Sequence, residues 1–118
     1  MKSLAGRISS LKYAFKGIAR VVKTQVNMRI HLLASIIVVA AAWYLRIAAN
    51  HWCILILTIS LVFAVEMLNT AVEFLCDAVT KEQNKYIAAA KDIGAAAVLV
   101  TAIASVIIGV IIFLPYIN

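Results

Sequence analysis

The sequence has little of what a water-soluble globule needs. Charged residues make up 14% of its 118 positions and hydrophobic residues 65%, whereas about 25% charged residues is usual in a soluble domain. Proline occurs once and glycine four times, so no flexible linker is visible. A chain of this length predicts a single domain, 1–118, and so little polar surface cannot cover a compact ball. These absences exclude a disordered chain and favour a small integral membrane protein.

Acidic residues are scarce as well, and none precedes Glu66. The chain has 11 basic and 5 acidic residues, which give a net charge of +6. Seven of the basic residues lie in the first 29 positions and three more in the segment 81–91. A basic chain can bind nucleic acid, but this hydropathy favours contacts with anionic lipid and topology signals instead. We therefore expect no nucleic-acid partner, with the N-terminus cytoplasmic and the C-terminus outside.

Three apolar runs predict transmembrane helices, at about 30–49, 52–78 and 93–117. A spanning helix needs about 20 predominantly apolar residues, and each run can supply them. The runs are continuous rather than alternating, which favours helices over the strands of a barrel. The expected fold class is an all-α membrane protein, a helical bundle.

The N-terminal segment 1–29 predicts an amphipathic helix rather than a signal peptide. Its apolar residues recur at spacings of 3 and 4: Leu4, Ile8, Leu11, Phe15, Ile18 and Val22. Basic residues cluster on an adjacent arc: Lys12, Lys16, Arg20 and Lys23. Such a helix is expected to lie in the cytoplasmic interface with its apolar face toward the lipid. It is either a simple anchor or a surface whose basic edge also helps hold an anionic ligand.

Polar side chains form a stripe on the second apolar run. Glu66, Asn69, Glu73 and Asp77 are spaced 3, 4 and 4 apart, which places them on one face of a helix, within an arc of about 80°. An ionised residue at the centre of a spanning helix costs about 2.5–3.5 kcal/mol, and three acids on one face repel each other unless a cation or a proton offsets them. The stripe suggests Mg²⁺, which combines carboxylate and phosphate oxygens. The alternative is a structural stripe that joins helices through hydrogen bonds.

The depth of these acids suggests a division of roles. Glu66 lies seven residues deeper than Glu73, about 10 Å along a helix, so it can meet the polar head of a lipid as a general base. Lys91 and Asp92 open the third run, where a lysine can serve as a point charge for phosphate. The small residues 94–97 are expected to serve packing only, and His31 to make a structural hydrogen bond.

The run Glu66-Met67-Leu68-Asn69-Thr70-Ala71-Val72-Glu73, followed by Asp77 and then by Lys91-Asp92-Ile93-Gly94, resembles the signature of the prokaryotic diacylglycerol kinase family. That family includes the undecaprenol kinases of Gram-positive bacteria. The resemblance implies a homotrimer with active sites shared between subunits, in the bacterial inner membrane. It also implies Mg²⁺-dependent transfer of the ATP γ-phosphate to a lipid hydroxyl.

The resemblance also assigns roles by position. Glu66 matches the general base, Glu73 a metal and nucleotide ligand, and Asn69 and Asp77 the supporting polar residues. The positions expected to contact the nucleotide are Tyr13, Glu73, Glu82, Asn84, Lys91 and Asp92.

One position departs from the family pattern. The family has a glutamate, a second metal ligand, where this chain has Gln25, which offers a carbonyl oxygen but no charge. Metal binding is therefore expected to be weaker, or the enzyme impaired. The acceptor, diacylglycerol or undecaprenol, is left open. The alternative from another class is a non-enzymatic small membrane transporter or scaffold.

Overall fold

The computed structural model describes residues 3–118, and Lys2 lies outside the described residues. Its elements in chain order are α1 (Leu4–Thr24), α2 (Val26–Leu45), α3 (Ala49–Val79), α4 (Lys85–Phe113) and a short 3₁₀ turn, η1 (Leu114–Tyr116). The helices α2, α3 and α4 are long and apolar enough to cross a membrane. The structure thus confirms the all-α membrane bundle.

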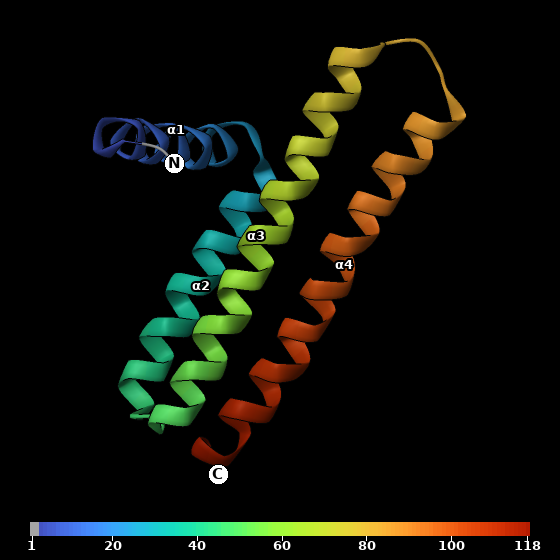
Figure 1. The fold of residues 1–118 in the computed structure, drawn as a ribbon. Helices are drawn as coiled ribbons and strands as arrows, with labels where there is room; N and C mark the ends of the chain where they lie inside the picture. The colour runs from blue at the N-terminus through green and yellow to red at the C-terminus, as the bar shows by residue number, and fades with distance from the viewer. Residues whose placement is uncertain (1–2) are drawn as a thin grey trace.

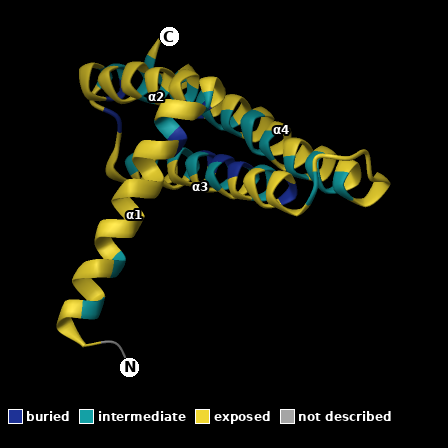
Figure 2. Cartoon of the chain, turned by 90° about the horizontal axis from the view of Figure 1, so that it is seen from above, coloured by how far each residue is buried: buried dark blue, intermediate teal, exposed yellow. Residues whose placement is uncertain are grey.

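The N-terminal helix leaves the bundle at a steep angle (Figure 1). Ser3 caps it, because the Ser3 hydroxyl accepts a hydrogen bond of 3.1 Å from the Gly6 N–H. Nearly the whole of α1 is exposed, and it points away from the other helices (Figure 2). Near its end it contacts α2 and α3, where Val21 is buried. An exposed apolar face beside a basic edge suits a helix lying on a lipid surface.

The surface helix is shorter than the expected segment 1–29. The chain turns extended at Gln25, with φ −112° and ψ 115°, and α2 begins at the next residue. Arg29 stabilises the break, because its Nη1 donates hydrogen bonds of 2.9 Å to the carbonyls of Val22 and Lys23. These are carbonyls at the end of α1 that the helix itself leaves without partners. A side chain from α2 therefore caps α1 and joins the two helices.

The three long helices run antiparallel, with α3 packed against both α2 and α4 (Figure 1). The turn between α2 and α3 lies at one end with the C-terminus, and the loop 80–84 lies at the other. Arg46 adopts the left-handed conformation (φ 54°, ψ 52°) and ends α2. The Tyr116 hydroxyl accepts a 2.9 Å hydrogen bond from the Ala48 N–H and lies 2.6 Å from His51 Nδ1. These contacts fix the C-terminal turn to the α2–α3 connection.

The buried core is small and lies near the same end as this turn. It consists of Ala42, Ile47, Leu55 and Ile112. Most other large apolar side chains of the three long helices are exposed, as expected for helices that face lipid or neighbouring copies. At about 1.5 Å per residue, the 31 residues of α3 extend about 46 Å, against a hydrocarbon core of about 30 Å. The helix is therefore longer than a membrane crossing requires.

Candidate active site

The polar stripe continues the buried face of α3. Toward the start of the helix this face carries the buried apolar residues Leu55 and Val62, and it becomes polar at Glu66 and Thr70, which are also buried. Further along, Asn69 and Glu73 are half-buried and Asp77 is exposed. The stripe therefore runs from an enclosed carboxylate to a carboxylate in contact with solvent.

Glu66 lies at the same depth along the bundle as the junction of α1 and α2. His31, in the second turn of α2, places its Nε2 3.7 Å from Glu66 Oε2. In Figure 1, α1 meets the bundle partway along α3, and the later part of α3 extends beyond that level. At about 1.5 Å per residue, Glu73 lies about 10 Å further along the helix and Asp77 about 16 Å further. If α1 lies in the interface, Glu66 is close to the membrane boundary and Asp77 is in water.

The carboxylate of Glu66 is enclosed. Glu66 is 1% exposed, and its Oε2 is buried with no hydrogen-bond partner among residues 3–118. The neighbouring Thr70 hydroxyl does not supply one, because it donates instead to the Glu66 backbone carbonyl at 2.9 Å. A buried carboxylate oxygen in this state can accept a proton or a hydrogen bond from a ligand.

Asn69 packs tightly against the fourth helix. Its Oδ1 is buried and has no hydrogen-bond partner in the described part of the chain, and it occupies the space where a Cβ on Gly94 would lie. The structure therefore gives Gly94 a more specific role than general packing, because a side chain at this position would displace the Asn69 amide.

A second polar cluster joins α3 to α4 near the loop. Lys91 Nζ lies 2.8 Å from Asp77 Oδ1, and both side chains are well exposed, at 41% and 55%. Asp92 is exposed on the same turn of α4. Solvent screens such a pair, so it contributes little to stability. Its ammonium group is accessible to a phosphate.

The loop contributes further polar groups to an open depression. Glu82, Asn84 and Lys91 are among its lining residues. Asn84 also caps α4, because its Oδ1 accepts hydrogen bonds from the N–H groups of Tyr86 (2.8 Å) and Ile87 (3.3 Å). The Glu82 N–H is held by the Thr80 hydroxyl at 3.0 Å. Three of the expected nucleotide contacts thus share one surface.

Tyr13 and Gln25 lie apart from this cluster. Tyr13 is exposed on α1, with the Lys16 ammonium 5.5 Å from its ring centre. Gln25 is half-buried at the α1–α2 break and donates a 3.3 Å hydrogen bond to the Thr24 hydroxyl. Across residues 3–118, no hydrogen bond or ion pair joins either side chain to α3 or α4. A single chain therefore brings together most of the expected site, but not these two residues.

The oxygen atoms of this site suit a metal ion that arrives bound to the phosphates of a ligand. No cluster of three or more His, Cys, Asp or Glu within residues 3–118 could hold a metal ion by itself. The oxygen donor nearest to being open to a ligand is the half-buried Glu73 carboxylate, and Asn69 lies on the same face of α3. Mg²⁺ is commonly bound by one or two carboxylates together with substrate phosphates. These residues fit a magnesium–nucleotide complex better than a closed protein metal centre.

Comparison with known proteins identifies the family. A family model described as prokaryotic diacylglycerol kinase matches residues 12–113. The chain belongs to the prokaryotic diacylglycerol kinase family. Kinases of this family act on lipids, so this chain is a lipid kinase with ATP as co-substrate, and the transporter and scaffold alternatives are not supported.

Relatives with both kinase names are similar to this chain. The undecaprenol kinase of Bacillus subtilis is 37% identical over 106 residues, which cover 90% of this chain and 86% of that protein. The diacylglycerol kinase of Synechocystis is 40% identical over 107 residues, which cover 90% of this chain but 61% of that protein. The diacylglycerol kinase of Escherichia coli K12 is 33% identical over 100 residues, which cover 85% of this chain and 82% of that protein.

Two features of the site do not follow from the sequence pattern. The sequence favours a structural hydrogen bond for His31, and the structure places this side chain beside Glu66. Its position near the cytoplasmic end of the first apolar run, at the depth of the acidic stripe, is the available signal. The space that Gly94 leaves for Asn69 depends on the helix crossing, which no local pattern reveals.

Proposed function

We propose that this lipid kinase transfers the γ-phosphate of ATP to the hydroxyl of a membrane lipid, with Glu66 as general base. The alcohol O–H bond breaks as its proton passes to the Glu66 carboxylate. The alcohol oxygen then forms a bond to the γ-phosphorus, and the bond between that phosphorus and the bridging oxygen breaks, with its electron pair leaving on ADP. The observation that carries the proposal is the carboxylate of Glu66, which is buried on α3 where the buried face of that helix changes from apolar to polar.

Glu73, with support from Asn69, would hold Mg²⁺ together with the phosphates of ATP. When bound, the ion neutralises phosphate charge and so favours attack at the γ-phosphorus. The half-buried position of Glu73, between enclosed Glu66 and exposed Asp77, supports this role. Glu73 itself orients the nucleotide from α3, while Glu66 faces the lipid.

Lys91 stabilises the charge that develops on the transferred phosphoryl group, and Asp77 orients the Lys91 ammonium through their 2.8 Å contact. Asp92, the next residue along α4, would contact the ribose of the nucleotide. The nucleotide occupies the open depression that Glu82 and Asn84 help to line. Tyr13 adds a contact from α1, and because no hydrogen bond or ion pair among residues 3–118 joins it to α4, that contact is proposed to reach the nucleotide from a neighbouring subunit.

The assembly is proposed to be a homotrimer with shared active sites, in which 1–118 forms a single membrane-embedded kinase domain. The N-terminus faces the cytoplasm and the C-terminus faces outward, in a bacterial inner membrane. The separation of Tyr13 and Gln25 from the α3–α4 cluster supports a site completed between copies. Mixing two impaired variants, Tyr13→Ala and Lys91→Gln, tests it. Activity returns if neighbouring subunits supply these two groups, and it stays low if one subunit supplies both.

The acceptor is either diacylglycerol or undecaprenol, since relatives carry both names. Assays of the purified chain with each lipid in the same micelles discriminate between them. Gln25 is proposed to weaken metal binding relative to the family pattern, because an amide oxygen carries no full charge.

The general base is tested by Glu66→Gln, which keeps the shape of the side chain but cannot take up the proton. We expect transfer of radiolabelled phosphate to fall by about 100-fold or more. Thr70→Val is the matched control, because Thr70 is buried on the same face and its hydroxyl donates to a backbone carbonyl one turn back on its own helix. If E66Q retained wild-type activity while folded in detergent, the assignment would be wrong.

A further inference from the structure

One polar side chain faces the buried carboxylate of Glu66 from another helix. His31 Nε2 lies 3.7 Å from Glu66 Oε2, and the two side chains are 23% and 2% exposed. This oxygen has no hydrogen-bond partner in the part of the chain that the structure describes. Leaving a buried acceptor unpaired is costly. An N–H on Nε2 of His31 is therefore well placed to satisfy it.

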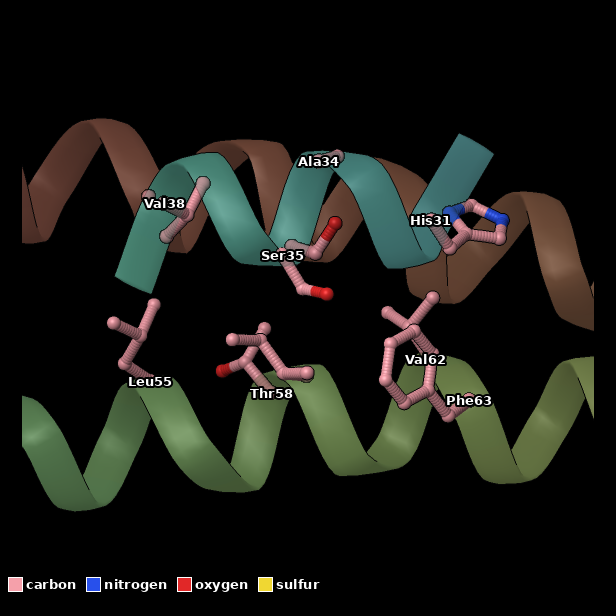
Figure 3. A pocket seen from close by; sticks show the side chains of 11 residues that line it. His31, Ala34, Ser35, Val38, Leu55, Thr58, Val62 and Phe63 are labelled. Carbon is pink, nitrogen blue, oxygen red and sulfur yellow. The ribbon is translucent and has the colours of Figure 1, made fainter. Parts of the chain in front are cut away.

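The remaining gap is short and the imidazole has room to close it. A hydrogen bond between nitrogen and oxygen spans about 2.7–3.2 Å, so the ring must move by less than about 1 Å. The ring borders a cavity of about 110 Å³ between α2, α3 and α4 (Figure 3). Ser35 lines the same cavity one turn further along α2. The ring is therefore not enclosed on every side, so the imidazole has space in which to reorient.

We infer that His31 is a positioning residue for the general base. Its Nε2–H donates to Glu66 Oε2, which fixes the carboxylate rotamer and leaves Oε1 to accept the proton of the lipid alcohol. His31 keeps its own proton throughout and acts only through Glu66. The inference rests on the proposed function, because it requires Glu66 to be the base.

Substitutions that move the hydrogen-bond donor of residue 31 distinguish a positioning role from simple packing. In His31→Gln the amide nitrogen lies near the place of Nε2, whereas in His31→Asn it lies near Nδ1 and falls short of Glu66. We expect H31Q to remain within about threefold of the wild-type kcat, and H31N and H31L to lose at least about tenfold. The KM for ATP should change by less than about twofold in all three. Ser35→Ala is the matched control and should behave as wild type.

Several outcomes would overturn the inference. These are equal impairment of H31Q and H31N, wild-type kcat in H31L, or a loss in S35A as large as that in H31N. Because H31Q and H31N both remove the ring, an effect on folding is common to them, and thermal unfolding in detergent checks it. Measuring E66Q beside them keeps the two proposals apart. An inactive E66Q with a fully active H31L rejects only the role of His31, whereas an active E66Q rejects the general base.

A measurement on the unmodified ring does not depend on any variant of His31. In ¹⁵N-histidine-labelled protein, the His31 ring signals should shift when Glu66→Gln removes the charged acceptor. The His51 signals should not shift, because His51 lies at the other end of the bundle against Tyr116. Unchanged His31 signals in folded E66Q would contradict the contact.

Discussion

Gly94 is a position where adding one methyl group tests the crossing of α3 and α4. An alanine Cβ there would overlap Asn69 Oδ1 and lie 3.4 Å from Asn69 Cγ. The backbone does not explain the glycine, since no glycine within residues 3–118 has a positive φ. Gly109, on the same helix, has open space instead, because a Cβ added there would meet nothing within 4 Å. The two glycines therefore form a matched pair, because both lie on α4 but only Gly94 has another side chain where its Cβ would be.

The two substitutions should have opposite effects on stability. In Gly94→Ala, either the Asn69 amide turns away or the helices separate, and overpacking of this kind costs about 1–3 kcal/mol. Alanine is otherwise the better helix former by about 0.5–1 kcal/mol. We expect G94A to be destabilised by up to about 2.5 kcal/mol, the difference of those terms, and G109A to be neutral or slightly stabilised.

Thermal unfolding in detergent micelles and phosphate transfer to lipid are the two assays. G94A should also lose activity, because Asn69 lies on the stripe between Glu66 and Glu73. G109A should keep its activity. If G94A proved as stable and as active as G109A, Asn69 would not depend on Gly94 and the argument from space would fail.

Three further predictions concern other parts of the chain. Tyr116→Phe removes the hydroxyl that fixes the C-terminal turn and should cost about 1–2 kcal/mol in detergent unfolding, with kinase activity kept; loss of activity without loss of stability would contradict this. Lys91→Gln should leave the unfolding temperature nearly unchanged, because its exposed contact with Asp77 is screened, while phosphate transfer falls sharply; the reverse pattern would refute the proposed role. Gln25→Glu should lower the Mg²⁺ concentration for half-maximal activity by about 5- to 30-fold, if the added charge is worth about 1–2 kcal/mol; an unchanged magnesium titration would show that residue 25 does not meet the metal.

The fold was largely predictable because it follows from hydropathy. Three long apolar runs and one amphipathic segment leave little choice but a helical membrane bundle. The residue at which the surface helix ends could not be predicted from hydropathy. It is set by the extended conformation of Gln25 and by Arg29, which donates to the carbonyls at the end of α1. That contact joins residues on two helices, and apolar periodicity does not record it.

The candidate site was predictable along α3 but not between helices. Helical spacing alone places Glu66, Glu73 and Asp77 on one face. The pairing of Asp77 with Lys91 depends on how the loop 80–84 returns the chain, so spacing along the sequence cannot give it. The approach of His31 to Glu66 likewise depends on how α2 packs against α3.

Under the proposed function, the length of α3 lets one helix reach both a lipid in the membrane and a nucleotide in water. A lipid alcohol stays in the membrane and a nucleotide stays in water, so the groups that handle them must be held at different depths. A helix only as long as the hydrocarbon core would end near the level of Glu66, and a flexible loop could not hold a carboxylate in an apolar setting. Because α3 continues for 13 residues beyond Glu66 to Val79, its face changes from apolar through an enclosed carboxylate to an exposed one without a break. The fixed rise of the helix then sets the spacing between the groups proposed to meet the lipid and the nucleotide, and packing against α2 and α4 fixes the direction in which they face.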